Sequence, residues 1–313
     1  MYNTASQISL GLCCINTQLR SQKPPIFCSR TCIRRTYSVE RAKSLALQNI
    51  QNIIPMIEWN EKNKIRCFRL SSNIFPHFTD SQTESYTIDF AKSDLQKAGN
   101  VANTYKHRIL MHPGQYNNVG AKNQQVVENT IRDLSHHADI LDCMNIDRNG
   151  VLIIHGGGLY GDKQSTIHRW LDQYDDLPQN VKNRLVLENC EKSFSTEDCL
   201  EISEEISIPI VFDFHHYNCY SILHPQVVQK PITELLPIIV NTWKKVYKTP
   251  LMHISEQGTG KCGHHSDFVE KIPSELLDYL TENPEIHVDL EVEAKMKEKA
   301  IFHLMTKYPS IFF

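Results

Sequence analysis

The sequence predicts a (β/α)8 TIM barrel that occupies residues 1–313 as a single domain. Eight short apolar runs alternate with stretches of helical periodicity, which is typical of a parallel sheet with crossover helices. Six of these runs are followed by a histidine or an acid. The chain has no low-complexity tract and no long Gly/Ser linker, and eight units favour a closed barrel over an open, doubly wound sheet.

The expected strands are short apolar runs without the polar alternation of a half-exposed sheet, so they fit strands that are buried on both faces. They lie at residues 9–15, 65–70, 108–111, 151–154, 184–187, 209–212, 250–252 and 286–292.

Helical periodicity is clearest over residues 123–144, where Val127, Ile131, Leu134 and Ala138 recur at steps of three and four. The other expected helices lie at residues 38–59, 81–97, 165–174, 196–206, 233–247, 267–281 and 294–305. A polar insertion over 172–182 is the weak candidate for a domain boundary, and a single domain is the simpler interpretation.

The composition, with 41% hydrophobic and 22% charged residues, is typical of a globular protein that buries a core. No apolar run approaches the ~20 residues of a membrane span, and the first run lacks a basic leader, so we expect no secretory signal. Ten scattered cysteines suggest a reducing, intracellular compartment, either cytoplasm or nucleus. Cys28 and Cys32 have a zinc-like spacing, but no second pair follows at a suitable distance.

A net charge of −3 does not by itself indicate a nucleic-acid-binding protein. Cations nevertheless concentrate after the first expected strand, in a segment that would otherwise be interpreted as an ordinary solvated loop. They are Arg20, Lys23, Arg30, Arg34, Arg35, Arg41 and Lys43.

Side chains of the metal-binding type follow six expected strands, and the intervals between them are close to the ~31 residues of one barrel unit. They are His112, His155, Glu188, Asp213 with His215 or His216, His253 and Glu293. The carboxyl ends of barrel strands meet on one face, so these residues should converge there, and His265 could join them. Buried acids and imidazoles at this density imply bound cations.

Mixed histidine and carboxylate ligation suits Zn, Mn or Fe, and there are enough ligands for two or three ions. Such ions activate water, so phosphodiester hydrolysis is the leading reaction class. Residues 156–161 also match the Gly-x-Gly-x-x-Gly pattern. That pattern lies in the fourth unit and follows His155, so we expect no nicotinamide or flavin.

The motifs resemble those of the UV damage endonuclease family, relatives of endonuclease IV among the metal-dependent, sugar-isomerase-like barrels. The matching blocks run in family order from residue 11 to about 298. They are GLCCIN at 11–16, RLSSNIFP at 69–76, HPGQY at 112–116, HGGG at 155–158, LEN at 187–189, FDFHH at 212–216, HISE at 253–256, HSD at 265–267 and VDLEVEAK at 288–295.

The resemblance implies a metal cluster in which Glu188 bridges two ions and His216, not His215, is a ligand. The implied ligands are His112, His155, Glu188, Asp213, His216, His253, His265 and Glu293, of which Glu188, His112, His155 and Glu293 are the expected catalytic residues.

The resemblance also implies residues that contact DNA. Gln115 and Tyr116 would probe the duplex, because an amide and an aromatic ring can fill the gap left by displaced bases. Asn16 matches a family residue near the lesion. The basic segment would then meet the phosphate backbone without base specificity, through Lys23, Arg30, Arg34 and Arg35.

The implied function is a monomeric endonuclease that uses metal-activated water to nick damaged double-stranded DNA. It would cut on the 5′ side of cyclobutane pyrimidine dimers and 6-4 photoproducts, with abasic sites as a further candidate, and leave a 3′-hydroxyl. Manganese is the expected metal, with Zn or Mg as alternatives. The competing hypotheses are a metal-dependent sugar isomerase or epimerase on the same barrel and a non-catalytic protein that binds damaged DNA.

Two positions depart from the family pattern. The family has a lysine near the metals, two residues before the seventh-strand histidine, where this chain has Leu251. An aliphatic side chain cannot bind a metal, so one ion is expected to be held more weakly or by additional water. Some members carry a tyrosine where Leu12 stands, so any stacking by that ring is lost.

Overall fold

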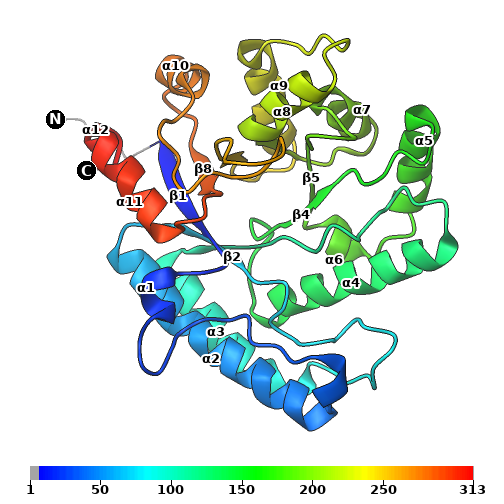
Figure 1. The fold of residues 1–313 in the computed structure, drawn as a ribbon, viewed down its shortest axis with the longest axis vertical. Coiled ribbons are helices and arrows are strands. Elements are labelled where there is room, and N and C mark those ends of the chain that lie inside the picture. The colour runs from blue at the N-terminus through cyan, green and yellow to red at the C-terminus, as the bar shows by residue number, and fades with distance from the viewer. Residues whose placement is uncertain (1–6, 313) are drawn as a thin grey trace.

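A computed structural model describes residues 7–312 and shows the predicted closed barrel (Figure 1). Within these residues, eight parallel strands pair in chain order, and the last pairs with the first. The predicted strands are all present, with ends displaced by no more than two residues. They are β1 (Ile8–Cys13), β2 (Cys67–Leu70), β3 (Arg108–Met111), β4 (Leu152–His155), β5 (Leu185–Glu188), β6 (Ile210–Asp213), β7 (Leu251–Ile254) and β8 (Val288–Val292).

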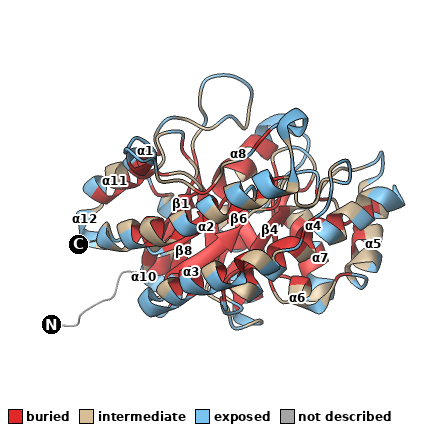
Figure 2. Cartoon of the chain, turned by 90° about the horizontal axis from the view of Figure 1, so that it is seen from below, coloured by how far each residue is buried: buried red, intermediate tan, exposed pale blue. Residues whose placement is uncertain are grey.

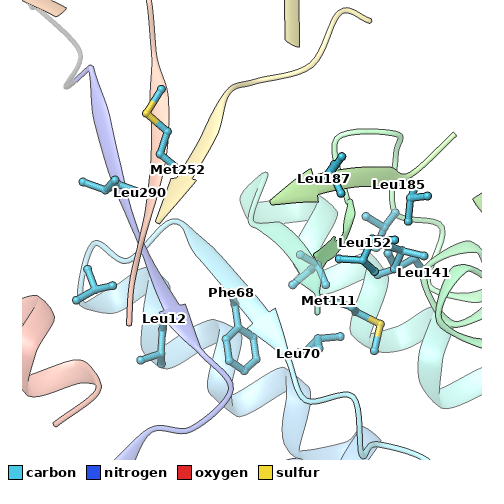
Figure 3. Packing of buried hydrophobic residues seen from close by; sticks show 14 of the residues in the cluster. Leu12, Phe68, Leu70, Met111, Leu141, Leu152, Leu185, Leu187, Met252 and Leu290 are labelled. Carbon is cyan, nitrogen blue, oxygen red and sulfur yellow. The ribbon is translucent and has the colours of Figure 1, made fainter. Parts of the chain in front are cut away.

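Alternate residues of each strand face the helices and the barrel interior. The outward set includes Leu12, Phe68 and Leu290, which lie in the large core beneath the helices (Figure 3). A second, smaller core of buried side chains contains the inward apolar residues of the strands. Its members are Cys67, Leu110, Val151, Ile153, Val186, Val211, Trp243 and Leu251.

The helices surround the sheet (Figure 1). They are α1 (Thr17–Arg20), α2 (Val39–Lys62), α3 (Lys92–Tyr105), α4 (Gln124–Cys143), α5 (Lys163–Tyr174), α6 (Gln179–Lys182), α7 (Thr196–Ile206), α8 (Phe214–Leu223), α9 (Ile232–Lys244), α10 (Ser274–Glu282), α11 (Glu298–Lys307) and α12 (Pro309–Phe312), with two 3-10 turns, η1 (Arg34–Thr36) and η2 (Asp89–Ala91).

Local hydrogen bonds explain where several helices begin. Ser38 and Asn123 accept backbone N–H bonds at the starts of α2 and α4, and Ser195 forms a capping box at the start of α7. Such caps satisfy N–H groups that have no partner inside the helix.

Three predicted helix starts are wrong. The helix expected over 81–97 begins at Lys92, because the preceding segment is irregular and the side chain of Asp80 accepts the backbone N–H of Gln82 in a turn. The helix expected over 267–281 begins at Ser274, after Pro273, whose ring disfavours a helical conformation in the residue before it. The last long helix begins at Glu298 instead of residue 294.

The ten cysteines form no disulfide within the described chain. Cys13 and Cys67 are buried as expected, whereas Cys14 is partly exposed. Cys28 and Cys32 are both buried, and they lie in none of the candidate metal groups found among residues 7–312.

Candidate metal centre

Glu188, at the carboxyl end of β5, is surrounded by four imidazoles from four other segments. Its Oε2 lies 3.0 Å from His112 Nε2 and 3.7 Å from His155 Nε2. Its Oε1 lies 3.1 Å from His253 Nδ1 and 3.4 Å from His216 Nδ1. The side chain of Glu188 is only 1% exposed. The barrel therefore brings together strand ends that are far apart in the sequence, as predicted.

The turn from β6 into α8 places two further ligand candidates side by side. Asp213 ends β6 and caps α8, with Oδ1 accepting the backbone N–H of His216 at 2.8 Å. Asn189 fixes this turn, because its side chain exchanges two hydrogen bonds with the backbone of Asp213. The neighbouring His215 points its ring nitrogens to Cys219 Sγ, at 3.6 and 3.7 Å. This placement agrees with His216 as the ligand.

Three sets of donor atoms lie close enough to hold an ion, each set within 4.8 Å. Glu188 belongs to two of these sets and Asp213 to two. The sets are His112, His155 and Glu188; Glu188, Asp213 and His216; and Asp213, His253 and Glu293.

The residues present fit divalent cations. The buried Asp213 Oδ2 accepts no hydrogen bond from the described residues, and the donors are imidazole nitrogens and carboxylate oxygens, which suit transition metals. Seven of the eight predicted ligands fall in the three sets. The eighth, His265, lies in a loop beside them, with Nε2 3.6 Å from Glu293 Oε2.

The electrostatics of the site are those of mutually paired acids and imidazoles. Burial favours the neutral form of Glu188, yet the four imidazoles around it together outweigh burial and lower the pKa of this carboxyl well below its usual range. Burial dominates at Asp213 and raises its pKa, and burial lowers the pKa of His155 to about 4. Burial lowers the pKa of His253, but Glu188, Glu291 and Glu293 together outweigh burial and raise this pKa well above its usual range. Bound cations would take the place of these protons.

Two charged residues inside the barrel were not predicted as part of the site. Arg69 on β2 lies 2.5 Å from Glu293 and 3.6 Å from Glu291, and Glu291 lies 2.9 Å from His253. A signal was present in the sequence: Asp289, Glu291 and Glu293 alternate along one apolar run, so all three face the same side of β8.

Leu251 is fully buried in the interior core of the barrel, two residues before His253 on the same strand face. Its side chain offers no ligand atom, and its neighbours in that core are apolar or cysteine.

The loop after β3 presents Gln115 and Tyr116 to solvent. The Tyr116 side chain folds back over Gly114, where a Cβ would meet its ring at 2.4 Å. The Tyr116 hydroxyl donates to Asp133 Oδ1 at 3.2 Å, and the residue remains 63% exposed. Gln115 is exposed as well. The ring is therefore held in position at the surface, in the loop that follows His112.

Asn16 lies between β1 and α1 and caps α1. It is fully buried, and its Oδ1 accepts the backbone N–H of Leu19 at 2.9 Å to cap α1. This cap is a structural role for Asn16. Its Nδ2 makes no hydrogen bond with the described residues, and its place near a lesion stays a prediction.

The basic segment follows β1 and begins in α1, which lies on the same side of the barrel strands as α8 in Figure 2. Arg34 forms an ion pair with Asp80, in which Nε lies 2.8 Å from Oδ2. Arg30 stacks on Phe27, with its Cζ 3.9 Å from the ring centre, and donates to the Phe27 carbonyl. Lys23 and Arg35 are exposed, and of the four predicted backbone contacts they are the two best placed to meet phosphate.

The chain is similar to known UV-damage endonucleases over nearly its whole length. The family model described as UV-endonuclease UvdE matches residues 8–312. A UV-damage endonuclease of Schizosaccharomyces pombe is 38% identical over 96% of this chain, and a UV DNA damage endonuclease of Clostridium perfringens is 32% identical over 86%. This chain spans about half the length of the S. pombe relative (50%) and 64% of the C. perfringens one. The crystal structure of SacUVDE superposes with a TM-score of 0.83 at 29% identity, covering 97% of this chain and 99% of the other.

Across residues 7–312, no helix is both long enough and apolar enough to cross a membrane.

Proposed function

The chain belongs to the UV-endonuclease UvdE family, and on this premise we propose that it is a metal-dependent endonuclease that nicks damaged double-stranded DNA. The proposal rests on the three sets of ligand atoms at the carboxyl face of the barrel. Glu188 joins the first set to the second, and Asp213 joins the second to the third. Ions held by such adjoining sets would suit in-line phosphodiester hydrolysis. We further propose incision on the 5′ side of cyclobutane pyrimidine dimers and 6-4 photoproducts, which leaves a 3′-hydroxyl.

We assign the three sets to two or three ions, with Mn²⁺ preferred over Zn²⁺ or Mg²⁺ and with His265 as an additional ligand. When bound, these ions supply an activated water and positive charge at the leaving oxygen. The protein contributes orientation: Asn189 and the α8 cap hold Asp213 and His216 in place, and Arg69 fixes Glu293.

The sugar-isomerase hypothesis uses the same barrel and metal ligands but gives no role to exposed Gln115 and Tyr116. One assay separates the three hypotheses. Irradiated and undamaged plasmids are incubated with the protein and Mn²⁺, and relaxation of supercoiled DNA is measured. We expect relaxation of the irradiated plasmid alone. Intact plasmid that is bound by the protein would favour the non-catalytic binder, and intact plasmid without binding would favour the sugar enzyme.

We predict that replacing Gln115 and Tyr116 together by Ala lowers the preference for irradiated over undamaged DNA by about 10- to 100-fold. The reason is that an aromatic ring that stacks on a base is worth about 1–3 kcal/mol, and the amide adds to it. Metal content should be unchanged, because neither side chain belongs to the three ligand sets. Both quantities are measured on the same preparation, by nicking rates and by elemental analysis. If the metal content falls as much as the preference for irradiated DNA, the loop only supports the fold and does not probe the duplex.

Tyr116→Phe is the matched control for that experiment. It keeps the ring and removes only the hydroxyl that donates to Asp133. If the ring probes the duplex, Tyr116→Phe should retain most of the lesion preference that the double Ala variant loses.

We also predict that Lys23→Gln and Arg35→Gln each weaken binding to undamaged duplex and lower the slope of log affinity against log salt by about one unit. Arg34→Gln should reduce the slope less, because that guanidinium is already paired with Asp80. Fluorescence anisotropy across a salt series measures all three. Equal slopes for the wild type and the Lys23 and Arg35 variants would remove the basic segment from the DNA interface.

A further inference from the structure

Glu291 is a buried carboxylate without a role in the ligand sets. It is fully buried in β8, and neither of its side-chain oxygens makes a hydrogen bond of regular geometry with the described residues. Its oxygens form ion pairs with His253 Nε2 at 2.9 Å and with an Arg69 guanidinium nitrogen at 3.6 Å. A buried carboxylate is costly unless it is paired, so a residue of this kind calls for an explanation.

The imidazole of His253 lies between two groups of carboxylates. Its Nδ1 faces the metal ligands, 3.1 Å from Glu188 Oε1 and 3.6 Å from Glu293 Oε1. Its Nε2 lies on the other side of the ring, 2.9 Å from Glu291 Oε2, and makes no hydrogen bond of regular geometry with the described residues. A neutral imidazole has one N–H and one lone pair, so an acceptor at Nε2 leaves the lone pair on Nδ1.

Other residues of the interior hold Glu291 in this position. The same Arg69 guanidinium contacts both Glu291 and Glu293, which links the two acids of β8. Gly11, the neighbour of Glu291 in the sheet, leaves room for its side chain, because a Cβ there would lie 3.0 Å from Glu291 Cγ and 3.2 Å from Cys67 Cβ.

We propose that Glu291, held by Arg69, is a positioning residue that accepts the Nε2–H of His253 and so directs the Nδ1 lone pair at an ion. Carboxylate partners of metal-binding histidines fix the tautomer and the ring orientation and increase the basicity of the ligand. The inference rests on the proposed metal centre and adds a residue to it that supports a ligand without contacting the ion.

The test is the Mn²⁺ affinity of the full chain after metal is stripped, measured by titration calorimetry. Glu291→Leu removes the acceptor and should lower the affinity for at least one Mn²⁺ ion about 10- to 100-fold. Glu291→Gln keeps an amide oxygen that can accept the N–H, so its loss should be smaller. Asp289→Asn is the matched control, because Asp289 is the neighbouring inward acid and pairs with Arg108 at 2.7 Å, away from the ligand sets. Its Mn²⁺ affinity should equal that of the wild type.

Circular dichroism of each stripped variant reports on folding, and Glu291→Gln carries the test if Glu291→Leu does not fold. In the Zn²⁺-loaded wild type, ¹⁵N-histidine spectra should show His253 bound to metal through Nδ1 and protonated at Nε2. A folded Glu291→Leu variant that binds Mn²⁺ as tightly as the wild type would overturn this inference alone, and so would spectra in which His253 Nε2 carries no proton. If Glu291→Leu does not fold, equal Mn²⁺ affinities of Glu291→Gln and the wild type would overturn it. A wild type that binds no Mn²⁺ would overturn this inference and the proposed metal centre together.

Discussion

Replacing Glu188 by Gln is expected to lower the rate of nicking of irradiated DNA by about a thousandfold. Glu188 belongs to two of the three ligand sets, so its loss weakens two ions whose transition-state stabilisation is worth several kcal/mol, and 1.36 kcal/mol corresponds to a tenfold change in rate. Glu188→Ala should have the same effect. Elemental analysis should show at least one ion fewer per chain in both variants.

The control is Glu285→Gln, which removes a carboxylate whose side chain is 66% exposed and whose contact with Lys244 spans 3.9 Å. It should keep wild-type activity and metal content. Circular dichroism distinguishes a lost ligand from a lost fold, since removing one partner from a buried charge cluster costs about 3–5 kcal/mol. A Glu188 variant that is folded and has an unchanged metal content would show that Glu188 does not bridge ions.

Removing the metals from the wild type should have the second large effect. After chelation and dialysis, nicking should fall to background, and added Mn²⁺ should restore it. The free energy of unfolding should also fall, by about 4 kcal/mol for each ion that was held at a thousandfold excess over its Kd. The measurements are the nicking rate and the thermal unfolding midpoint, with metal-saturated chelator as the control. Nicking that survives complete chelation would contradict the proposed mechanism.

The barrel and most of the candidate site were predictable for one physical reason. Parallel strands buried on both faces leave uninterrupted apolar runs, and the carboxyl ends of those strands meet on one face. His112, His155 and Glu188 therefore stand out as polar residues that end apolar runs. Their convergence follows from the topology once the sheet closes.

The parts that were missed depend on tertiary contacts. Glu291 lies inside an apolar run, and only the closed sheet places it beside His253. The helix α8 was not among the predicted helices, because its apolar and aromatic residues form no clear helical stripe. The capping role of Asn16 was missed as well, because its burial and its hydrogen bond to Leu19 depend on packing that the motif does not reveal.

The most direct test of the central claim uses a duplex with one cyclobutane pyrimidine dimer at a defined position, labelled on the damaged strand. With Mn²⁺, we expect a single cut on the 5′ side of the dimer and a 3′-hydroxyl that a DNA polymerase can extend, and no cut in the undamaged duplex. Equal cutting of the two duplexes, or an uncut dimer strand in the presence of a fully metal-loaded protein, would contradict the account.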